Sequence, residues 1–103
     1  MHDYSLPTKF DRLIHQPSRL AIMALLAGCE SADFTYLLKA TGLNKGTLSK
    51  HLSNLEGAGY IEIKKSFKGK FPNTSSSLTP VGRHAFKRYR QQYLEFSKSL
   101  GKE

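Results

Sequence analysis

The sequence predicts a mainly helical α+β fold with the order helix, helix, helix, strand, strand, helix. Three observations predict it. Apolar residues recur at helical spacing in several separate stretches, a basic segment with strand-like composition and turn residues follows the third of them, and a Thr-Pro pair marks the start of a last long helix. The length of 103 residues gives room for one domain with one modest core.

The first third of the chain is expected to be helical with short breaks. A short helix is predicted over residues 9–15 and a second over 17–28, where Pro17 suits the first helical turn because its missing N–H has no partner there in any case. Residues 31–33 predict a turn. A further helix then ends at Gly42, and the link from it to the next helix is very short. Two helices joined in this way are typical of a helix-turn-helix.

The most informative stretch is the helix predicted over residues 45–58. Leu48, Leu52 and Leu55 recur at i, i+4 and i+7, which places them on one side of the helix. The other faces carry small, polar and basic residues. Asn44 is a good N-cap for this helix.

Two strands and a long helix are predicted to follow. The strands are expected over 60–63 and 74–78, with a loop over 68–73 between them. Thr79 is an N-cap followed by a proline, so the last helix is expected to cover residues 80–100.

Charge is high and unevenly placed along the chain. The net charge is +8 and the isoelectric point is near 9.8. Between residues 63 and 94 there are eight Lys or Arg residues and no Asp or Glu. This pattern favours a polyanionic partner, whereas a module that binds only proteins has no need of it.

Three motifs resemble the stand-alone winged-helix transcriptional regulators of the ArsR and MarR groups: residues 44–52, 55–61 and 78–83. The resemblance implies a sequence-specific regulator that binds double-stranded DNA as a homodimer. Residues 9–79 would form the helix-turn-helix core and wing, helix 45–58 would enter the major groove, and the basic wing 64–72 would lie on the backbone or in the minor groove. A winged-helix protein-interaction module and an RNA or single-strand binder remain alternatives.

The DNA-binding residues expected from these motifs and from the residue chemistry are donors on the helix and cations on the wing. They are Asn44, Lys45, Gly46, Thr47, Ser49, Lys50, His51, Lys64, Lys65, Lys68, Lys70 and Arg83. A glycine inside a helix costs about 1 kcal/mol relative to alanine, so Gly46 is interpreted as allowing close approach to DNA. His51 either donates to a phosphate or packs against the core. Phe67 and Phe71 are expected to anchor the hairpin on the core, with stacking on single-stranded bases as the alternative.

A homodimer is expected to form mainly through helix 80–100, because that helix carries more apolar surface than a small head can cover. The predicted interface residues are Phe10, Leu13, Ile14, Phe86, Tyr89, Tyr93, Phe96 and Leu100.

Several other function classes are disfavoured by the sequence. No catalytic constellation appears, so an enzyme is not expected, and no cofactor is implied. A single cysteine, Cys29, allows no internal disulfide, and no clustered Cys and His suggest a metal site. No stretch suggests a signal peptide or a membrane span, which predicts a cytoplasmic protein with no membrane partner. Nothing in the sequence identifies a small-molecule effector.

Overall fold

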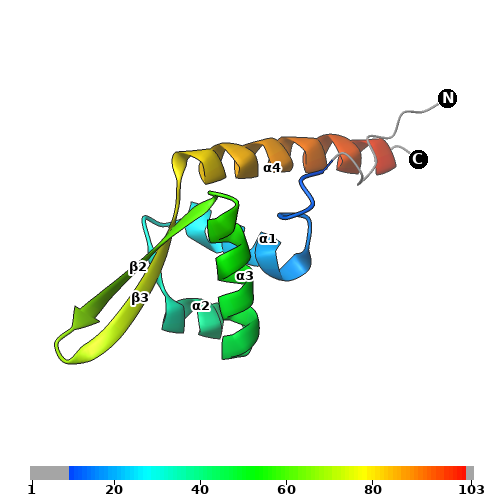
Figure 1. Ribbon diagram of the computed structural model, residues 1–103. Coiled ribbons are helices and arrows are strands. Elements are labelled where there is room, and N and C mark those ends of the chain that lie inside the picture. The colour runs from blue at the N-terminus through cyan, green and yellow to red at the C-terminus, as the bar shows by residue number, and fades with distance from the viewer. Residues whose placement is uncertain (1–9, 102–103) are drawn as a thin grey trace.

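The computed structural model describes residues 10–101. Its elements, in chain order, are α1 (Pro17–Ala27), β1 (Ala32–Asp33), α2 (Phe34–Thr41), α3 (Lys45–Gly57), β2 (Ile61–Lys68), β3 (Phe71–Leu78) and α4 (Pro80–Leu100). Figure 1 shows α1, α2 and α3 gathered into a head, the β2–β3 hairpin projecting from it as a wing, and α4 crossing the end of the head that is opposite α2.

Local signals determine where the helices begin. The side chain of Asn44 accepts a hydrogen bond from the backbone N–H of Thr47 at 2.8 Å, and that of Thr79 accepts one from Gly82 at 2.9 Å. These caps satisfy donors that a helix leaves unpaired in its first turn. The starts of α3 and α4 are therefore where the sequence predicts them.

The prediction of a helix over residues 9–15 is wrong. Residue 9 lies outside the described residues, and those that follow form a single turn. The Asp11 carboxylate accepts hydrogen bonds from the backbone N–H groups of Leu13, at 2.9 Å, and Ile14, at 3.2 Å. The turn cannot continue as a helix because Gln16 precedes Pro17 and adopts an extended backbone, with φ −150°.

The sheet has three strands in the order β1-β3-β2, all antiparallel. Residues 31–33 are therefore not only a turn, because Ala32 and Asp33 pair with β3. The wing strands are also longer than expected. The loop between them shrinks to Gly69 and Lys70, and Gly69 has φ +64°, the left-handed backbone that tight hairpin turns require at this position.

The core lies between the head helices, the base of the wing and the first half of α4. Leu48, Leu52 and Leu55 of α3 all point into it, as their spacing predicts. The remaining buried apolar residues are Phe10, Ile14, Ile22, Met23, Leu26, Ala32, Leu37, Ile61, Leu78, Phe86 and Tyr89.

A close backbone contact joins α4 to the base of the wing. A Cβ atom added at Gly82 would lie 1.9 Å from the Tyr60 carbonyl oxygen. The same oxygen accepts a hydrogen bond from the Thr79 N–H at 3.0 Å. Only glycine fits at position 82 in this arrangement, and the contact fixes where α4 leaves the head.

This packing corrects part of the predicted dimer interface. Phe10, Ile14, Phe86 and Tyr89 are buried within one protomer, where the Phe10 ring lies 5.5 Å from that of Tyr89. Side chains buried in this way have no surface to offer to a partner. Leu13 and Phe96 are half-buried, while Tyr93 and Leu100 are exposed. None of the helices in the described range is both long and apolar enough to cross a membrane.

Candidate nucleic-acid interface

The N-terminal half of α3 and the tip of the wing lie at the same end of the molecule, away from α4 (Figure 1). On α3, Lys45, Gly46, Ser49 and Lys50 are exposed, and Thr47 is half-buried. At 100° per residue, Gly46 and Lys50 point almost directly away from the three buried leucines. The helix therefore presents a narrow, polar and basic ridge.

Nothing in the fold requires the glycine at position 46. A Cβ atom there would meet only the Asn44 side chain, at an ordinary contact distance of 3.6 Å. Its backbone is helical, so it needs no left-handed conformation. Glycine weakens a helix relative to alanine, and no contact among residues 10–101 accounts for Gly46.

Strand alternation divides the wing side chains between two faces. Ile61 and Ile63 face the core, and Lys65 continues the same face outward. Lys65 borders a surface groove between the wing and α3, whose other walls include Ser49 and Ser53. Lys65 is the wing lysine that lines this groove together with residues of α3.

Lys64 and Lys68 lie on the opposite face. Lys68 forms an ion pair with Asp33 at 2.8 Å, and Asn73 donates to the other oxygen of the same carboxylate at 3.3 Å. These hydrogen bonds, with that from Lys68 the stronger, lower the pKa of Asp33. Asp33 stands at the N-cap position of α2 but makes no capping bond with its side chain. It instead ties the wing to β1, so Lys68 already has a partner within the chain.

His51 faces α1 rather than solvent. Arg19 Nη1 lies 3.3 Å from His51 Nδ1, and because arginine can only donate, this ring nitrogen is the acceptor. Burial, followed by the positive charges of Arg19 and Lys50, lowers the pKa of His51. Of the two roles left open by the sequence, packing against the head fits this geometry.

Arg83 lies apart from the other predicted DNA-binding residues. Its guanidinium donates to the backbone carbonyls of Ala27, at 3.3 Å, and Cys29, at 3.4 Å. It thus satisfies carbonyl groups at the C-terminal end of α1. Arg83 stands in the first turn of α4, and this helix begins at the end of the head away from the tip of the wing (Figure 1).

The expectation that Phe67 and Phe71 anchor the hairpin on the core is wrong. Their side chains are 72% and 75% exposed. The strands extend past the last core contact of the wing, so both rings lie near its tip.

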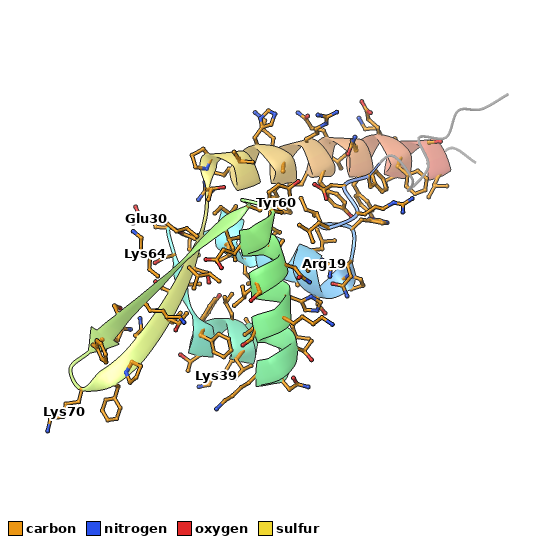
Figure 2. All side chains as sticks on the ribbon, in the orientation of Figure 1. Arg19, Glu30, Lys39, Tyr60, Lys64 and Lys70 are labelled. Atoms are coloured by element: carbon orange, nitrogen blue, oxygen red, sulfur yellow. The ribbon has the colours of Figure 1, made fainter. Side chains whose placement is uncertain are left out.

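A basic residue on α2 was missed by sequence reasoning. Lys39 is exposed in the last turn of α2, and Figure 2 shows it at the same end of the molecule as Lys70. Its position directly before the helix-turn-helix link was the signal that could have identified it.

Residues 10–101 contain no group of three or more His, Cys, Asp or Glu side chains placed to hold a metal ion. The Cys29 thiol is half-buried and donates to the Leu25 carbonyl at 3.3 Å. This is the packed arrangement of a cysteine at the end of a helix.

Comparison with known proteins supplies the family. Residues 18–98 match the model of the winged helix DNA-binding domain family. The chain belongs to this family. An uncharacterized protein of Methanocaldococcus jannaschii is 39% identical over 90 residues, which cover 86% of this chain and 97% of that protein.

Solved structures agree with this assignment. A transcriptional regulator homologue from Pyrococcus horikoshii OT3 superposes with a TM-score of 0.83 at 26% identity, covering 88% of this chain and 90% of that one. A MarR-family transcriptional regulator from Silicibacter pomeroyi has the same fold, with a TM-score of 0.67 at 17% identity over 95% of this chain and 65% of its own. The resemblance to winged-helix regulators is confirmed, and the two solved structures are those of a transcriptional regulator homologue and a transcriptional regulator.

Proposed function

We propose that the protein is a homodimeric transcriptional regulator that binds double-stranded DNA in a sequence-specific manner. In this proposal the N-terminal half of α3 enters the major groove and the wing lies on the backbone or in the minor groove. The observation that carries it is that the polar ridge of α3, with its unconstrained Gly46, and the basic wing lie at one end of the molecule.

Electrostatics supports a phosphate-rich partner. Lys45 and Lys50 on α3 and Lys64, Lys65 and Lys70 on the wing are exposed. Lysines on phosphates release counterions, so affinity should fall steeply as salt rises. Because phosphate contacts carry no sequence information, these side chains would position the protein rather than select the site.

Base selection is assigned to the side chains of α3. Ser49 and Lys50 stand on the exposed ridge one turn into the helix, where donors of a recognition helix reach base edges. Each lost base contact of good geometry should cost roughly 1–3 kcal/mol of discrimination.

The test is fluorescence anisotropy with the best duplex from a randomised selection and with a scrambled duplex, across a salt series. Replacing Lys64, Lys65 and Lys70 with alanine should weaken both complexes and reduce the salt slope by up to about 0.9 per lysine. The matched control removes three charges from α4 instead, at Lys87, Arg88 and Lys98, which are exposed far from the wing tip. Equal losses from both triple variants would remove the wing from the interface.

Base reading has its own outcome. Ser49→Ala and Lys50→Ala should narrow the difference between the selected and scrambled duplexes. If no selection emerges and the protein prefers single strands or RNA, the sequence-specific duplex proposal fails. If neither duplex nor single strand binds at low salt, a protein-interaction module becomes the better interpretation.

The homodimer is proposed to form through the exposed part of α4. Tyr93, Leu94 and Leu100 are 49%, 55% and 56% exposed, and an apolar groove whose walls include Leu20, Tyr93 and Leu94 runs beside them. Pairing two protomers about a twofold axis would present two recognition helices to half-sites about 34 Å apart.

Sedimentation equilibrium tests the dimer. The wild type should sediment at twice its mass of 11.6 kDa at micromolar concentration, and Leu94→Glu should shift it toward the monomer. Val81→Glu is a control on the same helix, because Val81 is 60% exposed but stands at the other end of α4. A monomeric wild type would contradict the proposal.

A further inference from the structure

The two most exposed large apolar side chains in the described range are at the tip of the wing. Phe67 is 72% exposed and Phe71 is 75% exposed. Each stands one residue from the Lys68-Gly69-Lys70 turn region, and the register pairs Phe67 with Pro72 and Phe71 with Lys68. Two aromatic rings and a proline therefore lie at the tip of a hairpin whose turn is only two residues long.

The fold does not explain these rings. The buried face of the wing ends near Ser76, and the partly buried residues packed against the core go no further along β2 than Ile63. Beyond that point Asp33 holds the hairpin to the rest of the molecule through its ion pair with Lys68 and its hydrogen bond from Asn73, on the face opposite Phe67. A solvated hairpin tip needs no phenylalanine, so the rings point to a partner.

Charge indicates what kind of partner it is. The rings alternate with Lys65, Lys68 and Lys70, and the wing beyond Glu62 carries no acidic residue. Such a tip is complementary to a polyanion. Phe67 also lies on the same strand face as Lys65, which borders the groove beside α3. Phe67 therefore continues the surface to which the proposed function assigns DNA, whereas Phe71, which pairs with Lys68, flanks the turn on the opposite face of the hairpin.

We propose that Phe67 and Phe71 form an apolar wedge that enters the minor groove of the bound duplex, partly unstacks a base step and bends the DNA. Apolar side chains of architectural proteins act in this way, and the distortion allows the duplex to contact more of the protein surface. The wedge would favour sites with a flexible pyrimidine–purine step beneath the wing tip, giving sequence preference without a hydrogen bond to a base. This inference rests on the proposed DNA binding.

The experiment measures bending at saturating protein, by energy transfer between dyes at the two ends of the selected duplex. The wild type should bend it by about 20–90°, and a 2-aminopurine placed at the unstacked step should brighten. Phe67→Thr with Phe71→Thr should abolish both signals, because threonine suits a strand but is no wedge. The affinity for the duplex should fall by less than about tenfold. Losing the contacts of the two rings weakens binding, but the variant no longer has to unstack a base step, and these two effects offset one another.

Two control variants separate the wedge from other roles. Phe67→Leu with Phe71→Leu should keep the bend, because leucine also serves as a wedge. Lys64→Ala with Lys65→Ala should weaken binding and lower the salt slope, yet keep the bend once the duplex is saturated. Both variants change exposed residues, so each is expected to fold, and circular dichroism is the check that it does.

Three outcomes would overturn the wedge. The first is a bend unchanged in the threonine variant. The second is a threonine variant that loses binding to single strands but keeps the duplex bend, which would indicate base stacking. The third is a threonine variant that still bends the duplex but no longer binds anionic vesicles or no longer self-associates. A wild type that binds no duplex would instead contradict the proposed function itself.

Discussion

Replacing Gly82 with alanine tests the contact that attaches α4 to the wing. The new methyl carbon would lie 1.9 Å from the Tyr60 carbonyl oxygen and 2.8 Å from the Tyr60 carbonyl carbon. A Cβ atom does not tolerate contacts below 3.0 Å. The two backbones must therefore separate by at least 1.1 Å, which is the difference between this 3.0 Å limit and the 1.9 Å distance to the Tyr60 oxygen. Both atoms belong to the main chain, so no side-chain rotation can relieve the clash.

The separation has a cost that can be estimated. The Thr79 N–H to Tyr60 O bond, now 3.0 Å, would be stretched beyond hydrogen-bonding range, at about 0.5–1.5 kcal/mol. Overpacking adds about 1–3 kcal/mol. The higher helix propensity of alanine returns at most about 1 kcal/mol. The net loss in the free energy of unfolding is therefore about 0.5–4.5 kcal/mol, which lowers Tm by roughly 2 °C or more in a domain of this size.

Thermal unfolding followed by circular dichroism measures the effect, at one fixed protein concentration because a dimer makes Tm concentration-dependent. Gly57→Ala is the matched control, since a Cβ atom there has nothing within 4 Å and the position is helical. It should raise Tm by a few degrees through helix propensity, up to about 1 kcal/mol. Gly46→Ala should also leave the fold intact while weakening DNA binding. A Gly82→Ala protein as stable as the wild type would refute the reasoning.

Three further predictions concern polar contacts. Burial and Arg19 hold the pKa of His51 below 6.5, so His51 binds fewer protons in the folded state than in the unfolded state. The contribution of His51 to stability should therefore decline as pH falls below 6.5. Arg19→Ala should raise the midpoint of the His51 titration measured by NMR. Lys68 lowers the pKa of Asp33 below 3.8, so the ion pair should be complete above that pH. It should be lost only as pH falls through the lowered pKa that Asp33 has in the folded protein. Lys68→Ala should raise the midpoint of the Asp33 carboxyl titration. The hydrogen bond to Asp11, followed by burial, raises the pKa of Tyr60 to about 12. Tyr60→Phe should therefore remove a phenol that ionises near pH 12 from an absorbance titration, and it should lower Tm.

Features with local causes could be predicted from the sequence. The start of α3 follows from Asn44 and its inner face from the spacing of three leucines, and the start of α4 follows from Thr79 and the proline after it. Each signal acts within one or two helical turns. The winged-helix resemblance rests on the same residues, which is why it placed α3 correctly within the fold.

Features caused by distant contacts could not be predicted. β1 contains only Ala32 and Asp33, and it is a strand only because β3 lies beside it. The role of Gly82 depends on Tyr60, which lies far away in sequence, directly before β2. Arg83 was assigned to DNA because it is basic and near the wing in sequence, whereas its guanidinium reaches the end of α1. In each case the chain folds back and supplies a partner that no local pattern reveals.

Some residues conflict with the ordinary preference of their type at their place in the fold, and these conflicts are informative for a different reason. Gly82 violates helix propensity, and the Tyr60 carbonyl explains it entirely. Gly46 violates the same rule, and Phe67 and Phe71 violate the rule that large apolar side chains avoid water, yet no neighbour in the described range explains them. Sequences usually agree with their folds except where function demands otherwise. Because these three unexplained residues lie on α3 and the wing, at the end of the molecule away from α4, the exceptions themselves indicate the surface that meets a partner.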